Sequence, residues 1–322
     1  MRTLLPLLLI LLASCGQEDL RAKLRIGLNP WPGYLDLAVA DSEGIFARHG
    51  LDVQIVEYSS LHDMSRAFQM GQIDFMPCTL VEVLEVNQGK RRAEVIWVAD
   101  ASEGADVVLA HAISSAAELR GKRIAYEPNS LGIYVLARML DRAGLTMTDV
   151  EPIGMDQTQM VEAMEAKRID AAVTYPPSSL SIRELDGVRP VFTTAEIPGE
   201  VIDVFSVDSA ILDADPTFLQ RFYASMAELE SFSRANPETA ITHKCRHMGL
   251  DRSGWEEATA GARYYSLVDQ FEWIWGSRRI HDSLARMTEA LRATCGPRRQ
   301  PGDEAVASRR PAPPQAIPPS PR

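Results

Sequence analysis

The feature that most constrains the fold is an alternation of short apolar runs with helix-period segments, which occurs twice along the chain. The first unit reads KLRIGLN, YLDLAVADSEGIFARHG and LDVQIVEY, and a further helix is expected near residues 60–70. This alternation is typical of βαβ units, in which helices join parallel strands. In the first helix the apolar positions share one face, and Gly50 ends the segment. We therefore expect an α/β fold.

The same order of motifs recurs later in the chain. RIGLNP is echoed by RIAYEP, HGLDV by AGLTM, and GQIDFMPCT by KRIDAAVTY, with separations of 98, 94 and 96 residues. Three echoes in one order indicate two copies of a single structural plan. With 322 residues, the chain has room for two domains of ordinary size.

Two apolar runs bracket the second unit and predict crossover strands between two lobes. They are VVLAHA at residues 107–112 and VIDVFSV at residues 201–207. Two crossovers of this kind form a hinge. We expect lobe 1 to comprise residues 24–105 and 204–295, and lobe 2 to comprise residues 106–203. Long helices that complete lobe 1 are expected at 216–234, 255–265 and 281–294.

The amino-terminal segment MRTLLPLLLILLASC has the pattern of an export signal. Arg2 precedes an apolar run at residues 4–12 that is too short to span a membrane. The ending LASC matches the lipobox of bacterial lipoproteins, which predicts a signal peptide at 1–14, lipidation of Cys15 and a tether at 15–23. Lipid chains on Cys15 would then anchor the protein to the membrane. The alternative is an ordinary secretory signal with a chance cysteine.

The carboxyl end and the overall charge limit the range of partners. Residues 296–322 are crowded with proline, arginine and alanine, so we expect a disordered tail. The formal net charge of −11 argues against nucleic acid as a partner. The composition, 46% hydrophobic and 24% charged, is that of a globular protein.

The sequence predicts no metal site, no cofactor and no catalytic motif. His243 and His247 share helix spacing but lack further zinc ligands, and Gly-rich phosphate loops, GxSxG and HExxH are absent from the sequence. Cys78 is expected to be a buried free thiol. Cys245 and Cys295 either form a disulfide or stay free, because sequence gives no distance between them.

Taken together, these motifs resemble a known family. The chain is similar to the substrate-binding proteins of bacterial ABC importers for nitrate, alkanesulfonate, taurine and thiamine-precursor pyrimidines. Over roughly residues 24–295, the resemblance rests on the lipobox, IGLNPWPGY, GIFARHGLDVQIVEY, GQIDFMPCT, DASEGADVVLA, LRGKRIAYEPNSLGIYVL and KRIDAAVTY. The chain departs from the family at Tyr175-Pro176-Pro177, where an aromatic residue, a glutamate and one proline are usual, and this departure calls the usual ligand chemistry into question.

The resemblance implies a two-lobed periplasmic-binding-protein fold of type II. Each lobe would be a mostly parallel sheet flanked by helices, and two crossover strands would join the lobes. A monomer of this kind closes on a small solute in the periplasm or at the cell surface and delivers it to permease and ATPase subunits at the inner membrane.

Both echoed corners are expected at the cleft, because ligands of parallel sheets bind beyond the carboxyl ends of the strands. Helix amino termini offer unpaired amide donors to an anionic or polar group. The candidates are Gly33, Tyr34 and Leu35 in one lobe and Ser130, Leu131 and Gly132 in the other.

Side chains of these corners extend the expected site. Trp31 and Tyr34 would stack on the solute, although a buried role for Trp31 is the alternative. Thr79 and Thr174 offer hydroxyls from opposite lobes, and helix capping is the alternative for each. The expected ligand-binding set is Trp31, Gly33, Tyr34, Thr79, Glu127, Ser130, Leu131, Thr174, Tyr175 and Asp203.

Acidic residues bear on the charge of the solute. Six fall in or near the expected cleft: Glu82, Asp100, Glu103, Asp106, Glu127 and Asp203. Of these we expect Glu127 and Asp203 to contact the ligand, the first at a strand end and the second at a crossover. If both face the cleft, a cationic or zwitterionic solute fits better than nitrate, whereas a sulfonate would rely on the helix amino termini.

The expected function is therefore that of an extracytoplasmic solute-binding lipoprotein of an ABC importer. Its solute would be a small nitrogen- or sulfur-containing organic compound of the sulfonate, amine or pyrimidine type. A ligand-sensing lipoprotein of the same fold is one alternative. A periplasmic enzyme that uses a cleft carboxylate as a base is the other.

Overall fold

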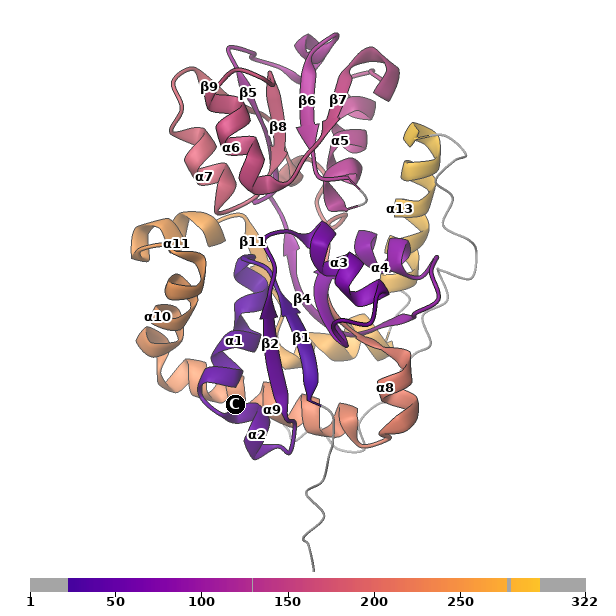
Figure 1. Cartoon of the computed structure of the whole chain (residues 1–322), viewed down its shortest axis with the longest axis vertical. Helices are drawn as coiled ribbons and strands as arrows, with labels where there is room; N and C mark the ends of the chain where they lie inside the picture. Colours follow the sequence, from indigo (N-terminus) through magenta and orange to yellow (C-terminus); the bar gives the residue numbers. More distant parts are fainter. Residues whose placement is uncertain (1–22, 129, 277–278, 296–322) are drawn as a thin grey trace, which may run out of the picture.

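The computed structural model describes residues 23–295, apart from residues 129 and 277–278 and the side chains of residues 294–295. Figure 1 shows two lobes stacked along the long axis of the molecule, each with a sheet between helices. The predicted signal peptide, Cys15, nearly all of the tether and the predicted tail lie outside the described residues. No helix within the described ranges combines the length and apolar character that a membrane span requires.

Lobe 1 contains a six-stranded sheet in the order β11-β4-β10-β3-β1-β2. Its strands are β1 (Leu24–Leu28), β2 (Val53–Glu57), β3 (Phe75–Thr79), β4 (Ala93–Ser102), β10 (Ile202–Asp208) and β11 (Ala262–Tyr264). Lobe 2 contains a five-stranded sheet in the order β7-β6-β8-β5-β9. Its strands are β5 (Val107–His111), β6 (Arg123–Tyr126), β7 (Glu151–Gly154), β8 (Ala171–Thr174) and β9 (Val188–Thr193).

The prediction of two mostly parallel sheets is wrong for the strands beside the hinge. In lobe 1, β1 runs parallel to β2 and β3, but β10 runs antiparallel to both β3 and β4. In lobe 2, β6 runs parallel to β7 and β8, whereas β5 runs antiparallel to β8 and β9. The reason is the double crossover: β4 leads the chain out of lobe 1 and β10 leads it back, so these neighbours run in opposite directions.

Helices cover both faces of the two sheets. Lobe 1 has η1 (Pro32–Tyr34), α1 (Leu35–Ser42), α2 (Ile45–Arg48), α3 (Leu61–Gln69), α4 (Leu80–Val86), α8 (Ser209–Ala214), α9 (Phe218–Ala235), α10 (Pro237–Met248), α11 (Arg252–Thr259), α12 (Leu267–Gln270) and the π-helical η5 (Phe271–Gly276). Lobe 2 has η2 (Ala116–Leu119), α5 (Leu131–Arg142), η3 (Met147–Asp149), α6 (Gln157–Glu165), α7 (Ser178–Arg183) and η4 (Thr194–Glu196). The last helix, α13 (Arg279–Cys295), contacts α4 of lobe 1 and α5 of lobe 2 (Figure 1).

One expected helix is replaced by a helix and a strand. The expectation of a helix over residues 255–265 is wrong, because α11 ends at Thr259 and β11 then pairs with β4. Gly261 lies against the first crossover: its carbonyl accepts a hydrogen bond from the Glu103 amide at 2.7 Å, and a Cβ there would lie 2.4 Å from the Ala105 nitrogen. The helix therefore stops where the chain passes the hinge.

The two crossovers are bonded to each other. Residues 103–106 link β4 to β5, and η4 begins the segment that links β9 to β10. The Thr194 hydroxyl lies 2.7 Å from the Ser102 hydroxyl and accepts from the Gly104 amide at 2.9 Å, while the Thr194 amide donates to the Asp106 carbonyl at 3.0 Å. This buried contact fixes the two connections side by side and confirms two crossovers between the lobes.

The echo in the sequence corresponds to a repeated ion pair. The Arg25 side chain and amide donate to the Asp74 carboxylate, and the Asp74 amide donates back to the Arg25 carbonyl at 2.8 Å. In lobe 2, Arg123 and Asp170 form the same set of bonds. Each pair joins the first strand of its lobe's unit to the residue before a neighbouring parallel strand, β1 to β3 in lobe 1 and β6 to β8 in lobe 2. The repeated Arg and Ile-Asp motifs therefore have one structural role.

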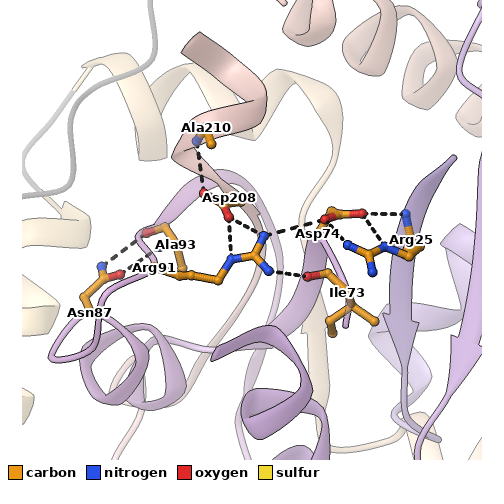
Figure 2. A network of polar contacts seen from close by, with 8 residues as sticks. All are labelled: Arg25, Ile73, Asp74, Asn87, Arg91, Ala93, Asp208 and Ala210. Carbon is orange, nitrogen blue, oxygen red and sulfur yellow. Dashed lines mark hydrogen bonds and ion pairs between the residues drawn. The ribbon is translucent and has the colours of Figure 1, made fainter. Parts of the chain in front are cut away.

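In lobe 1 this pair is part of a larger network. Figure 2 shows the Arg91 guanidinium between Asp74 and Asp208, with its nitrogen also donating to the Ile73 carbonyl at 3.3 Å. Asp208 in turn accepts from the Ala210 amide at 3.0 Å and so caps α8. The network joins β1, β3, β10 and α8 at the amino-terminal ends of β1 and β3, which are opposite the cleft.

Two cysteines, Cys78 and Cys245, are free thiols. Cys78 is buried, as expected, and burial raises the pKa of its thiol well above the usual value. Cys245 is a free thiol whose sulfur lies 3.7 Å from the Asp251 carbonyl oxygen. Of the two possibilities for Cys245, the structure therefore has the unpaired one.

Candidate functional site

A small cavity lies between the two lobes, at the carboxyl ends of the parallel strands. Its volume is about 10 Å³, which is room for about one water molecule. Residues from both lobes line it: Asn29, Trp31, Tyr34, Leu61, Thr79, Asp106, Leu131, Tyr175 and Asp203. Six of these were expected from the sequence, namely Trp31, Tyr34, Thr79, Leu131, Tyr175 and Asp203.

The corner after β1 forms the lobe 1 wall, and its aromatic side chains bind carboxylates. The buried Trp31 indole N–H donates to both Asp100 oxygens, at 3.2 and 3.3 Å. The Tyr34 hydroxyl donates to Asp203. Gly33 lies so near that a Cβ would be 1.7 Å from an Asp100 oxygen. The structure thus gives Gly33 a role that sequence did not suggest, which is to let this corner approach Asp100.

The corners after β6 and β8 form the facing wall in lobe 2, with Leu131 from the first and Tyr175 from the second. Tyr175 packs edge-on against Trp31 with ring centroids 6.0 Å apart, and its hydroxyl donates to Glu127 at 3.2 Å. Gly132 starts α5 close to the Glu127 backbone, where a Cβ would lie 2.7 Å from the Glu127 nitrogen. Thr174 is also buried, but its hydroxyl donates to Gln157 at 2.8 Å and it does not line the cavity.

Two carboxyls meet across neighbouring strands beside the cavity. Asp100 on β4 and Asp203 on β10 are directly paired positions. Burial raises the pKa of Asp100 to about 7, and burial together with the Asp100 charge raises the pKa of Asp203 well above its usual value. Each carboxyl thus opposes ionisation of the other, because two buried charges side by side repel each other.

A third carboxyl, Asp106, lies where the first crossover enters lobe 2. Burial raises the pKa of Asp106 to about 7, although its contact with the Ser102 hydroxyl opposes the shift. Glu127 behaves alike: burial raises its pKa to about 7, and hydrogen bonds from the His62 amide, Gln157 and Tyr175 oppose the shift. The site therefore concentrates acidic groups that titrate near neutral pH.

Two helix amino termini at the cleft, those of α5 and α3, are bonded to the protein's own carboxylates. Glu82 of lobe 1 accepts from the Ser130 hydroxyl at 2.6 Å and from the Leu131 amide at 2.7 Å, at the start of α5 in lobe 2. Its other oxygen accepts from the Thr79 amide and hydroxyl, which caps α4. The donors of Ser130 and Leu131, expected to hold an anionic ligand, are thus bonded to Glu82.

The opposite contact runs from lobe 2 to lobe 1. Glu127 accepts from the His62 amide at 3.4 Å, at the start of α3, whose own N-cap is Ser60. Each lobe therefore places one buried carboxylate at a helix amino terminus of the other lobe, where the helix dipole favours negative charge. These reciprocal contacts hold the lobes together in the described conformation.

Several atoms that face the site have no hydrogen-bond partner. They are the Asn29 amide nitrogen and oxygen, Asp106 Oδ2 and Asp203 Oδ2. All three side chains are buried and line the same cavity. Burying polar atoms without partners costs free energy, so such atoms mark a position where a ligand can supply the missing bonds.

A second, larger cavity adjoins the first. Its volume is about 350 Å³, and Asn29 lines both cavities. Its walls are Leu28, Pro30, Leu35, Glu57, Tyr58, Ser59 and His247 of lobe 1 and Thr158 of lobe 2. Asn29 thus lies between the small buried cavity and this larger one, which we call the outer groove.

Sequence reasoning missed Asn29, Leu61 and the role of Glu82, and it did not select Asp106. The signal for Asn29 was present, because aligning RIGLNP with RIAYEP places Asn29 opposite Glu127. Aligning GQIDFMPCT with KRIDAAVTY likewise places Thr79 opposite Tyr175, and both line the cavity. Leu61 gave no signal, since it begins an ordinary amphipathic helix. Of the other acidic candidates, Glu103 is exposed and lies 3.8 Å from Arg263.

The described residues offer little for metal or nucleophilic chemistry. They include no group of three or more His, Cys, Asp or Glu side chains arranged to hold a metal ion. His243 pairs with Glu43 at 3.0 Å and His247 pairs with Glu57 at 3.3 Å. What the site can do is hold a small polar group, or exchange protons with it through carboxyls of raised pKa.

Comparison with known proteins gives a consistent result. The model of the NMT1-like family matches residues 17–244. A candidate binding protein of Brucella abortus (strain 2308) is 26% identical over 68% of this chain and 69% of its own length. A candidate aliphatic sulfonates-binding protein of Escherichia coli (strain K12) is 24% identical over 74% of this chain and 75% of its own length.

The fold is shared with solved structures. The alkanesulfonate-binding protein from Xanthomonas axonopodis pv. citri, solved with MOPS bound, superposes with a TM-score of 0.72 at 19% identity, covering 85% of this chain and 93% of that one. At this identity the similarity shows the fold alone, and that fold is the two-lobed periplasmic-binding-protein fold.

Proposed function

Because the chain belongs to the NMT1-like family, we propose that it is the extracytoplasmic solute-binding component of an ABC importer. It captures a small nitrogen- or sulfur-containing organic solute between its lobes and delivers it to the permease and ATPase. The relatives named for sulfonate binding and for ABC transport support this role.

The observation that carries the proposal is the cavity between the lobes. It is lined by the matching corners of two duplicated units, with Trp31 and Tyr34 on one side and Leu131 and Tyr175 on the other. Two hydrogen-bonded crossovers provide the hinge about which such walls can part. Capture by closure needs this combination of a two-sided site and a hinge.

We also propose the lipid anchor on Cys15 and lobe boundaries at 24–105, 106–203 and 204–295. The anchor is supported by the LASC lipobox after a short apolar run. Replacing Cys15 by alanine should move the mature protein from the membrane fraction to the soluble extracytoplasmic fraction. Membrane retention of the alanine variant would contradict the anchor and leave solute capture untouched.

Solute capture is tested by a thermal-shift screen of the mature chain against amines, sulfonates and pyrimidines. A solute that binds only the folded state raises the melting temperature, by an amount set by its concentration relative to Kd. Binding should have 1:1 stoichiometry, and the solute should be recovered unchanged after incubation.

A variant pair locates the site. Trp31→Ala should weaken binding at least tenfold, because it removes a wall of the cavity. Phe271→Ala, which changes an exposed aromatic outside the cavity, should leave binding unchanged. Consumption of the solute would overturn the binding role, and equal affinity of the two variants would overturn the site.

A further inference from the structure

The cavity between the lobes presents three oxygens that lack hydrogen-bond partners. They are Asn29 Oδ1, Asp106 Oδ2 and Asp203 Oδ2. An ammonium group carries three N–H donors and no acceptor. We propose that the solute carries a protonated primary amine, whose ammonium group lies among Asn29, Asp106 and Asp203. This inference rests on the proposed function and specifies the class of solute.

Charge favours a cation at this position. Two carboxyls line the cavity, and a third, Asp100, pairs with Asp203 on the neighbouring strand and is bonded to Trp31. Among the nine residues that line the cavity, none is basic. A buried carboxylate is stable only with a nearby opposite charge or enough hydrogen-bond donors, and an ammonium group supplies both.

Two of the helix amino termini that could bind an anion are filled. The amide at the start of α5 and the Ser130 hydroxyl are bonded to Glu82, and the amide of His62 at the start of α3 is bonded to Glu127. A sulfonate would have to displace one of these carboxylates, and it would then lie among the remaining ones. Placing a sulfonate next to buried carboxylates is strongly unfavourable, because like charges repel each other more in a buried site than in water.

Size favours a primary amine over a methylated one. The cavity has a volume of about 10 Å³, which suits a group about as large as water. A trimethylammonium group is several times larger and has no N–H to donate. Trp31, Tyr34 and Tyr175 line the cavity as well, and aromatic rings attract a cation.

The remainder of the solute has a place in the outer groove. Asn29 lines both this groove of about 350 Å³ and the buried cavity, so a group bonded at Asn29 can continue into it. The walls of the groove come from both lobes, with Thr158 from lobe 2. A solute with an amine at one end and a small organic body therefore matches both cavities.

Three probes with the same four-carbon body test the inference: n-butylamine, butyltrimethylammonium and butanesulfonate. Each is titrated into the mature full chain and followed by thermal shift and calorimetry. Butylamine should stabilise the protein and bind at least tenfold more tightly than the other two. Binding should release protons, measured in two buffers of different ionisation enthalpy, because a bound ammonium group favours the ionised forms of Asp106 and Asp203, whose pKa values are raised by burial.

Matched variants locate the ammonium group. Asp106→Asn should weaken butylamine binding at least tenfold, and Asp203→Asn is a second variant should the first fold poorly. Asp186→Asn removes one carboxylate from an exposed position and should leave the affinity unchanged. Equal affinities of Asp106→Asn, Asp203→Asn and the wild type would overturn the assignment.

The outcomes separate this inference from the function on which it rests. A wider panel of primary amines, sulfonates and pyrimidines is screened alongside the three probes. If the solutes that stabilise the protein carry no amine, or if butyltrimethylammonium binds as well as butylamine, the inference is overturned while solute capture stands. If no member of the panel stabilises the protein, the proposed function is overturned as well.

Discussion

At the residue scale, the corner of residues 28–34 shows how a sequence motif can be recognised while its chemistry is misjudged. Its aromatic and glycine residues predicted a site, and the structure places Trp31 and Tyr34 at the cavity. Their polar atoms, however, are directed to Asp100 and Asp203. Sequence could not show this, because both aspartates come from strands far along the chain.

Gly33 gives the sharpest prediction at this scale. In Gly33→Ala the new Cβ would overlap an Asp100 oxygen at 1.7 Å, so either the corner or Asp100 must move. We expect the free energy of unfolding to fall by about 1–3 kcal/mol, as in overpacked cores, and solute affinity to fall with it. Urea unfolding measures the first effect and titration of a bound solute the second.

Gly154→Ala is the control for this substitution. A Cβ at Gly154 meets its nearest neighbour at 3.5 Å, which is ordinary van der Waals contact. Its stability should therefore differ little from that of the wild type. A Gly33→Ala variant as stable as Gly154→Ala would show that the corner does not need to approach Asp100.

The buried carboxyls predict a pH dependence with a definite sign. The pKa values of Asp100, Asp106 and Glu127 are raised to about 7 by burial. Between about pH 4 and pH 7 these groups hold protons that the unfolded chain has lost, so the free energy of unfolding should fall as the pH rises. The full loss at each group is on the order of 3–4 kcal/mol.

The measurement is urea unfolding of the solute-free protein at about pH 5 and pH 8. The other titratable groups that face this cluster are Glu82, Asp203, Tyr34, Tyr175 and Tyr264. In the Asp106→Asn variant residue 106 cannot ionise, so the free energy of unfolding should fall less steeply with pH than in the wild type. Stability that rises across this interval in the wild type would refute the assignment of protonated carboxyls.

At the element scale, the sequence predicted repeated units well and the pairing of the hinge strands poorly. The expected helix near residues 60–70 is present as α3, with Ser60 as its N-cap. Apolar alternation reports which segments are strands but not their direction, so the antiparallel β10 was not predicted. The end of α11 depends on a contact between Gly261 and the hinge, which no local pattern reveals.

The repeated ion pairs allow a matched comparison between the lobes. Asp74→Asn should cost more stability than Asp170→Asn, because Asp74 also faces Arg91 and its side chain is 13% exposed, against 29% for Asp170. We expect a loss of about 2–3 kcal/mol for the first and about 1 kcal/mol for the second. The assay is urea unfolding, and equal losses would mean that Arg91 adds nothing.

At the scale of the whole molecule, the two reciprocal carboxylate contacts determine how the lobes meet. Glu82 spans from α4 to the start of α5, and Glu127 spans from the end of β6 to the start of α3. Both carboxylate side chains are buried, and the hinge behind them is short and hydrogen-bonded. A balance between an open and a closed form therefore depends on a few polar bonds that the solute can reinforce.

Removing the Glu82 contact should shift this balance toward the open form. Glu82→Gln loses the charge that favours the start of α5, and Ser130→Ala removes one bond to Glu82 while leaving the α4 cap intact. Both variants should show a larger radius of gyration without solute in small-angle X-ray scattering. Glu165→Gln, at an exposed position on α6, should match the wild type.

The effect on binding follows from the same equilibrium. If closure without solute shields the cavity, the more open variants should bind solute with a faster association rate. Their closed complexes also lack bonds that Glu82 makes in the wild type, so the solute should dissociate faster. Stopped-flow measurements through tryptophan fluorescence separate the two rates. If Ser130→Ala and Glu82→Gln both kept the dimensions and both rates of the wild type, closure would depend neither on the Glu82 charge nor on its bond to Ser130, and would be governed elsewhere in the interface.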